Sequence, residues 1–284
     1  MGGPGIGMRV IDAHVHVWEL DRLKYGWLTP AAGPLFRDVT VEETLEATSD
    51  AGVDGLVLVQ AADSIVETRW LADIARSTGA VLGVVGWLPI GFPERVAAAL
   101  DTEFADALCG VRALVHDSSD NGLLASQPVI ETVRLLGRRG LAFDVPDAFP
   151  RLATATCELL RAAPHSVIVI DHLGKPGPNA DLDAWADWIH SVAAHPNTVG
   201  KLSGFTSSGG RLPAAAVARI VDVALEAFGP DRLLFGSDWP IGATGAGYRD
   251  VLDVTIEAIS ALSEPERAAV LAGTAARVYN FAVA

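Results

Sequence analysis

Short apolar runs alternate with longer amphipathic segments along the whole chain. The runs are almost continuous in valine, isoleucine and leucine, which is typical of strands buried on both faces of a parallel sheet. The segments between them are rich in alanine, leucine, glutamate and arginine and show helical periodicity. Eight such runs occur: VIDAHVHV (10–17), GLVLVQA (55–61), VLGVVGWL (81–88), GVRALVH (110–116), LAFDV (141–145), VIVIDHL (167–173), TVGKLSG (198–204) and LLFGSDW (233–239).

The segments between these runs carry the boundary signals of helices. Thr40 and Glu43 have the spacing of a reciprocal capping box, and Ser263 and Glu266 repeat it near the end of the chain. Strands that alternate with helices in this way predict an α/β fold, a (β/α)8 TIM barrel. A doubly wound sheet is the alternative, but no Gly-x-Gly-x-x-Gly follows the first run. We expect a single domain over residues 1–284 that ends in a helical tail.

The longest connection, residues 19–39, follows the first predicted strand and contains Tyr25, Trp27 and Phe36. In a barrel, a long loop at this end of a strand lies beside the pocket. Its aromatic side chains then form a lid over a substrate. Packing of the same rings against the barrel for stability is the other interpretation, and the sequence leaves both open.

The charge balance narrows the range of partners. Lys and Arg total 21 against 35 Asp and Glu, a net charge of −14, which argues against nucleic acid or an anionic membrane as the main partner. No apolar run is long enough to span a bilayer, and the first ten residues lack the apolar region of a signal peptide. Met8 is an alternative start. We expect a cytoplasmic protein in which Cys109 and Cys157 are reduced thiols.

Histidine and aspartate gather where the predicted strands end, which is where barrels carry out their chemistry. His14 and His16 lie two residues apart and therefore project from the same side of a strand. His172 and Asp238 end the sixth and eighth runs. Two imidazoles with a third histidine and a carboxylate form a plausible Zn²⁺ shell, so we predict a metal site or direct catalysis here.

Asp238 has two interpretations. Beside a metal or a histidine cluster, its carboxylate takes a proton from a water molecule that then attacks an acyl carbon, while the metal or the imidazoles polarise the carbonyl. Alternatively, Asp238 caps a helix that starts in the sequence SDWP. We favour the general base, because the residue before a proline is restricted and distorts an ordinary cap.

Other polar and aromatic residues complete a predicted substrate pocket. Arg112 and Lys201 are charges inside apolar runs, so each needs a partner. That partner is either a structural carboxylate such as Asp12 or Asp144, or the carboxylate or hydroxyl groups of a substrate. The residues predicted to bind substrate are Arg112, Lys201, His116, Gln60, Trp87 and Trp27, whereas surface positions are expected for His165, His190 and His195.

An ordered series of motifs covers nearly the whole chain: IDAHVHVW, YGWL, VLVQAADSIVETRWLADIA, GVVGWLP, GVRALVH, DHLGKP, KLSG, LLFGSDWP and LSEPERAAVLAGTAARVYNF. In these motifs the sequence resembles the amidohydrolase superfamily, and within it the amidohydrolase-2 branch of sugar-lactone and related lactone hydrolases, which includes fuconolactonase-like, rhamnonolactonase-like and pyrone-dicarboxylate-lactonase-like enzymes. The resemblance implies a (β/α)8 barrel that hydrolyses a lactone ester. It implies that His14, His16 and His172 bind a divalent metal or polarise the carbonyl, and that Asp238 is the general base.

The resemblance also limits the cofactor. No lysine at a strand end is placed to serve as a carbamylated bridge and no histidine ends the fifth run, so the expected cofactor is one divalent ion, Zn²⁺, rather than a binuclear centre. Some members of the branch work without metal. Ala113 follows Arg112 where these lactonases often have histidine, and His116 stands where they have glutamine, which leaves the lactone itself open.

Two other functions compete with lactone hydrolysis. One is a metal-dependent decarboxylase of the same superfamily, which would use an arginine to clamp a carboxylate. The other is a catalytically inactive barrel that binds a sugar acid, against which the intact set of His14, His16, His172 and Asp238 argues. The expected partner is a small lactone, and a homo-oligomer is compatible with the sequence.

Overall fold

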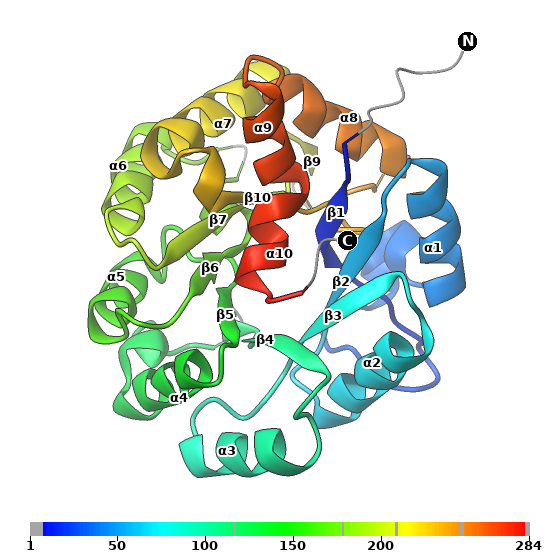
Figure 1. Ribbon diagram of the computed structural model, residues 1–284, viewed down its shortest axis with the longest axis vertical. Helices are drawn as coiled ribbons and strands as arrows, with labels where there is room; N and C mark the ends of the chain where they lie inside the picture. Colours follow the sequence, from blue (N-terminus) through cyan, green and yellow to red (C-terminus); the bar gives the residue numbers. More distant parts are fainter. Residues whose placement is uncertain (1–7, 116–117, 178, 208–209, 245–246, 282–284) are drawn as a thin grey trace.

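Eight parallel strands form one sheet in the order in which they occur along the chain, with helices around it (Figure 1). The structure is a computed structural model that describes residues 8–115, 118–177, 179–207, 210–244 and 247–281. Each of the eight predicted runs overlaps a strand of this sheet, although β4 begins two residues before the run predicted at 110–116, and this arrangement confirms the (β/α)8 barrel. The strands are β1 (Ile11–Val15), β2 (Gly55–Val59), β3 (Val81–Gly86), β4 (Leu108–Arg112), β5 (Ala142–Val145), β6 (Ile168–Ile170), β7 (Thr198–Leu202) and β10 (Leu233–Phe235).

The first strand and the segment after the last one close the barrel. The amide of His16 donates to the carbonyl of Trp239 (2.8 Å), and the amide of Asp238 donates to the carbonyl of His14 (2.9 Å). These bonds continue the parallel pairing as an isolated bridge between Val15 and Trp239. Closure therefore places the HVH and SDW segments side by side.

A helix follows nearly every strand, and the predicted capping signals are seen in part. The side chain of Thr40 accepts from the amide of Glu43, but the Glu43 carboxylate pairs with Arg37 instead of closing the reciprocal box. Ser263 and Glu266 form both halves of theirs. The surrounding helices are α1 (Val41–Asp50), α2 (Ile65–Ser77), α3 (Pro93–Thr102), α4 (Gln127–Arg138), α5 (Ala153–Ala162), α6 (Leu182–Ala193), α7 (Ala214–Phe228) and α8 (Tyr248–Ala258).

The C-terminal tail closes one end of the barrel. It consists of α9 (Glu264–Ala268), a π-helical turn (Ala269–Gly273) and α10 (Thr274–Val278). Figure 1 shows α10 lying across the centre of the ring of strands. Its side chains join the inward-facing residues of the strands, such as Ile11 and Leu234, in one apolar cluster. Because these residues precede the histidines and aspartate on their strands, the tail lies at the end of the barrel opposite the candidate site.

Some elements were not predicted from the sequence. A short antiparallel hairpin follows β7, in which β8 (Thr206–Ser207) pairs with β9 (Gly210–Arg211) and each strand has two residues. Within the described ranges, short helical turns occupy the connections at Pro30–Leu35, Leu123–Ala125, Asp171–Gly174 and Pro230–Arg232. The turn that opens at Asp171 matters most, because it carries a predicted site residue.

The structure describes both cysteines. Cys109 is buried, Cys157 is half-buried and neither is in a disulfide. Among the described residues, no helix combines the length and apolar character needed to cross a membrane.

Candidate active site

His14 and His16 both face the barrel interior because β1 contains an irregularity. The register between β1 and β2 shifts between Asp12 and Val15. Ala13 packs among the inward-facing apolar residues, yet the next residue, His14, also faces inward. Such a bulge re-aims side chains and is common beside active sites. The predicted side-by-side placement of the two imidazoles is therefore observed, at a point where strict alternation is broken.

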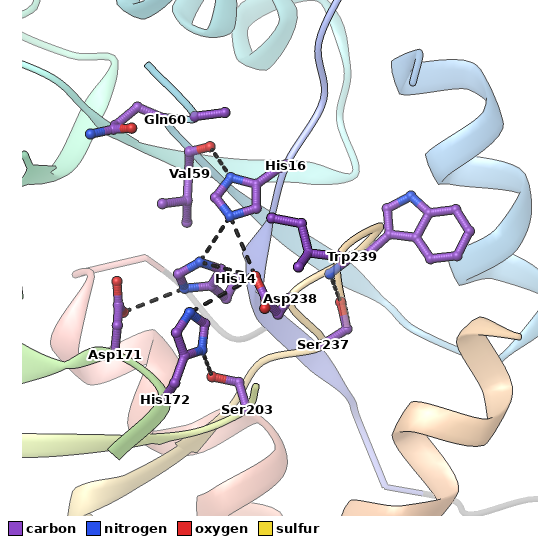
Figure 2. A network of polar contacts seen from close by, with 12 residues as sticks. His14, His16, Val59, Gln60, Asp171, His172, Ser203, Ser237, Asp238 and Trp239 are labelled. Atoms are coloured by element: carbon purple, nitrogen blue, oxygen red, sulfur yellow. Dashed lines mark hydrogen bonds and ion pairs between the residues drawn. The ribbon is translucent and has the colours of Figure 1, made fainter. Parts of the chain in front are cut away.

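The two imidazoles converge with the carboxylate of Asp238 (Figure 2). Nε2 of His14 lies 3.1 Å from Nε2 of His16, and Oδ1 of Asp238 lies 3.5 Å from Nε2 of His16 and 3.8 Å from Nε2 of His14. One donor atom from each residue falls within 4.8 Å of the others, and all three side chains are buried. Two imidazoles and a carboxylate at this spacing fit a divalent cation such as Zn²⁺.

Backbone conformation aims Asp238 into this cluster. Asp238 has a φ of 60°, a left-handed conformation that aspartate tolerates better than most residues. Its Oδ1 faces the imidazoles, whereas Oδ2 is buried and has no hydrogen-bond partner in the part of the chain that the structure describes. Gly236 permits the approach of the two segments, because a Cβ there would lie 2.7 Å from Cβ of His14. A carboxylate so placed faces the imidazoles, and among the described residues no helix begins at Asp238 for it to cap.

His172 reaches the cluster from the turn after β6. Positive φ values at His172, Leu173 and Lys175 (54°, 52° and 57°) flank Gly174, and such strained runs collect at functional sites. Nδ1 of His172 is 2.6 Å from the hydroxyl of Ser203, which fixes the ring and leaves Nε2 3.8 Å from Oδ1 of Asp238. Gly204 gives the ring its space, since a Cβ there would lie 2.8 Å from Cβ and Cγ of His172.

Burial and mutual proximity set the charge states of the cluster. Burial lowers the pKa of His172, and it lowers the pKa of His14 well below its usual range. Burial alone would raise the pKa of Asp238, but the imidazoles, His172 foremost, hold that pKa below its usual range. At neutral pH, His14 and His172 are therefore neutral and Asp238 is ionised, as metal ligation and general-base catalysis both require.

A layer of buried charges lies beneath His14. Nζ of Lys201 is 2.8 Å from both Oδ2 of Asp144 and Oδ1 of Asp171, and it is 3.1 Å from Nδ1 of His14. Burial would lower the pKa of Lys201, but the two carboxylates raise it, so the ammonium stays charged. Lys201 thus has the structural partner Asp144 that the sequence offered as one option, and it is fully buried.

Arg112 lies between this layer and the imidazoles. Its Nε is 3.2 Å from Oδ2 of Asp171, and Nη1 is 3.4 Å from both Nε2 of His14 and the carbonyl of Gln60. The amide of Gln60 donates to the carbonyl of Arg112 and to Asp63, while its Oε1 is buried without a hydrogen-bond partner. The structure therefore brings Arg112 and Gln60 to the site, and their predicted contacts with substrate stay a prediction.

Trp27, Trp87 and His116 are the remaining residues that were predicted to bind substrate. The indole of Trp27 donates to the carbonyl of Ala61 (2.8 Å). Trp87 is half-buried, and its backbone bonds with the hydroxyl of Thr68. His116 falls outside the described residues, so the prediction for His116 stays untested.

The long loop at residues 19–39 packs down against the barrel. Trp18, Tyr25 and Leu28 form a buried cluster with Val39, Ala61 and Ala62, and Trp27 packs against its edge. Tyr25 and Trp27 therefore have the stabilising role that the sequence left open beside the lid, and they hold the loop against the connection that follows β2, whereas Phe36 is 42% exposed.

Two carboxylates organise the site in ways that sequence reasoning did not predict: the sequence offers Asp12 as a partner of Arg112 or Lys201, and it gives Asp171 no role. Oδ1 of Asp12 accepts from the amides of His14 and Ser237, and Oδ2 accepts from the hydroxyl of Tyr248 (2.6 Å). This one side chain ties β1 to the segment that carries Asp238. Asp171 contacts His14, Arg112 and Lys201. The signal available for both was an acidic residue inside or directly after a run that is otherwise apolar.

The buried carboxyl group of Glu67 makes the folding stability depend on pH. Its side chain is 1% exposed, and its Oε2 accepts from the amides of Ala61 and Ala62. Burial raises the pKa of Glu67 to about 8 from an ordinary value of 4.5, although the two amides, Tyr25 and Arg112 oppose the rise. Between these two pH values the folded protein keeps a proton that the unfolded chain has lost, so folding stability falls as pH rises, by up to about 1.4 kcal/mol per pH unit.

We therefore expect Glu67→Gln to flatten the pH dependence of stability between pH 5 and pH 8. The measurement is the free energy of unfolding by urea at several pH values, compared with the wild-type protein. Asp54→Asn, at an exposed carboxylate outside the site, is the control and should keep the wild-type slope. Equal slopes in Glu67→Gln and the wild-type protein would contradict a buried, protonated Glu67.

Similarity to known proteins agrees with this geometry. A family model described as Amidohydrolase matches residues 11–281. An L-fucono-1,5-lactonase from Burkholderia multivorans is 31% identical and is aligned over 96% of this chain and 97% of its own length. An L-fucono-1,5-lactonase from Burkholderia ambifaria is 30% identical over 84% of this chain and 83% of its own length.

A solved structure shares the whole architecture. The crystal structure of an amidohydrolase from Burkholderia multivorans with bound zinc is 28% identical, covers 96% of this chain and all of its own, and superposes with a TM-score of 0.88. The match of the family model over nearly the full barrel confirms the resemblance seen in the motifs around His14, His172 and Asp238. This chain belongs to the amidohydrolase family.

Proposed function

We propose that this protein hydrolyses a lactone derived from a sugar acid, with Asp238 as the general base. The observation that carries the proposal is the placement of Asp238, whose Oδ1 faces three imidazoles while its buried Oδ2 has no hydrogen-bond partner among the described residues. The two similar proteins named L-fucono-1,5-lactonase, one aligned over nearly the whole chain, support an aldonolactone as the substrate class.

His14, His16 and Asp238 would hold one divalent cation, which we propose to be Zn²⁺, with His172 beside them. When bound, such an ion acts as a Lewis acid on the ester carbonyl and makes water a stronger acid. The zinc in the similar amidohydrolase supports this choice of metal. A lactonase that uses the imidazoles directly is the alternative, in which Nε2–H of His172 donates to the carbonyl oxygen.

We assign each residue of the site a separate role in the hydrolysis. Oδ2 of Asp238 accepts a proton from water, the water oxygen bonds to the carbonyl carbon, and the bond from that carbon to the ring oxygen breaks. Asp238 returns the proton to the ring oxygen, which yields a hydroxy acid. Ser203 holds the ring of His172, and Arg112 and Gln60 bind hydroxyl groups of the substrate.

A decarboxylase of the same superfamily is less well supported. A decarboxylase would need Arg112 to bind the carboxylate of its substrate. Nε of Arg112 instead faces Asp171 at 3.2 Å, so much of its charge is already balanced by a residue of the chain.

A panel of aldono-1,5-lactones, aldono-1,4-lactones, muconolactones and pyrone lactones tests the function. Acid release would be followed with a pH indicator, with spontaneous ring opening subtracted from a sample without protein. We expect at least one aldonolactone to be hydrolysed with kcat/KM of about 10⁴ M⁻¹s⁻¹ or more, the lower range of ordinary enzymes. Release of CO2 without ring opening would favour the decarboxylase, and inactivity on every lactone would contradict the proposal.

A further inference from the structure

The protonation of His16 is fixed by a backbone carbonyl. Nδ1 of His16 lies 2.8 Å from the carbonyl oxygen of Val59, and a carbonyl only accepts. Nδ1 of His16 therefore carries the proton, and a neutral His16 keeps its lone pair on Nε2, which faces His14. A backbone acceptor on the remote nitrogen is the usual way in which a protein orients a histidine that binds a metal.

His14 has no such carbonyl, and its Nδ1 faces two charged side chains of opposite kind. Nζ of Lys201, which only donates, is 3.1 Å away, and Oδ1 of Asp171, which as a carboxylate only accepts, is 3.4 Å away. Figure 2 shows Asp171 on the side of the His14 ring opposite His16. The tautomer of His14 therefore depends on which of these two buried groups bonds with Nδ1.

Each choice has a consequence at the other ring nitrogen. If Lys201 donates to Nδ1, a neutral His14 carries its proton on Nε2 and directs it at the lone pair of His16, 3.1 Å away. If Nδ1–H donates to Asp171, Nε2 of His14 keeps a lone pair beside that of His16. Nη1 of Arg112, a donor 3.4 Å from Nε2 of His14, favours the second arrangement.

We propose that Asp171 is a positioning residue that holds His14 in the tautomer protonated at Nδ1, so that Nε2 of His14 and Nε2 of His16 present two lone pairs to one cation. The inference rests on the metal centre of the proposed function and adds a residue outside its ligand set. Nζ of Lys201 pairs with Oδ1 of Asp171 and Oδ2 of Asp144, both at 2.8 Å and closer than Nδ1 of His14 at 3.1 Å, which directs two of its three protons to the carboxylates and keeps Asp171 ionised. The carboxylate thus acts on the metal through His14 without contact with the metal or the substrate.

Asp144 provides a matched control for Asp171. Both carboxylates are fully buried and both bond with Nζ of Lys201 at the same distance, but the other bond of Asp144 is with the hydroxyl of Tyr279 rather than with His14. Zn²⁺ affinity would be measured by competition with a chromophoric chelator. We expect Asp171→Asn to bind Zn²⁺ about 10–100-fold more weakly, as for lost partners of ligating histidines, and Asp144→Asn to bind it near the wild-type affinity.

The tautomer itself is read from the wild-type protein, which does not depend on how well a variant folds. Long-range ¹H–¹⁵N spectra of metal-free protein labelled with ¹⁵N-histidine should show His14 protonated at Nδ1 before any Zn²⁺ is added, with the signals assigned by their loss in His14→Asn. A proton on Nε2 of His14, or equal loss of affinity in Asp171→Asn and Asp144→Asn, would overturn the proposal. If the wild-type protein binds no Zn²⁺, the metal centre fails, and the spectrum of the same sample still decides the role of Asp171.

Discussion

Replacement of Asp238 by asparagine is expected to lower kcat/KM for the best lactone by about 10³-fold to 10⁴-fold, the range for loss of a general base. The amide has nearly the same shape, but it cannot accept the proton of the attacking water. The surrounding imidazoles keep Asp238 ionised at neutral pH, so the wild-type base is present in its active form and the variant loses all of it. The measurement is the steady-state rate on the lactone identified by the panel.

Two comparisons make the Asp238→Asn result specific. Stability should be measured alongside activity, because Asp238 lies at the point where the barrel closes and its amide bonds with the carbonyl of His14. Asp54→Asn, which removes an exposed carboxylate away from the cluster, should retain full activity. A folded Asp238→Asn protein with wild-type kcat/KM would refute the assignment of Asp238 as the base.

The barrel could be predicted because a strand that is buried on both faces has a recognisable sequence, a short and nearly continuous apolar run. Each run of valine, isoleucine and leucine became a strand, since such a run satisfies an apolar layer on either side. The clustering of His14, His16, His172 and Asp238 followed from the same reasoning, because parallel strands in a barrel all end on one face. The chemical roles of these residues stay predictions.

The partners of the buried charges could not be predicted, because they depend on contacts between distant strands. Register places Arg112 of β4 beside Asp144 of β5, yet Arg112 pairs with Asp171, from the turn after β6, and Asp144 pairs with Lys201 of β7. The choice depends on side-chain length across the barrel, which no local pattern records. The bulge in β1 and the left-handed turn at His172 are invisible in sequence for the same reason.

Replacement of Lys201 by methionine is expected to lower the free energy of unfolding by about 3–5 kcal/mol, the usual loss when one partner of a buried ion pair is removed. The side chain is fully buried, so the loss is not compensated by water. Methionine fills a similar volume but leaves Asp144 and Asp171 in the same layer with Arg112 as their remaining charged partner, and burial already raises the pKa of Asp144. The measurement is urea unfolding at pH 7.

The test separates the two roles that the sequence left open for Lys201. If Lys201 is a structural cation, the double variant Lys201→Met/Asp144→Asn should recover part of the lost stability, because the second change removes one uncompensated carboxylate. Arg249→Met, which removes one partner of an exposed ion pair with Asp253, should leave stability nearly unchanged, since such pairs contribute little. A stable Lys201→Met protein with a raised KM would instead show that Lys201 binds the substrate. In that case the buried layer would need another positive charge to keep Asp171 ionised beside His14.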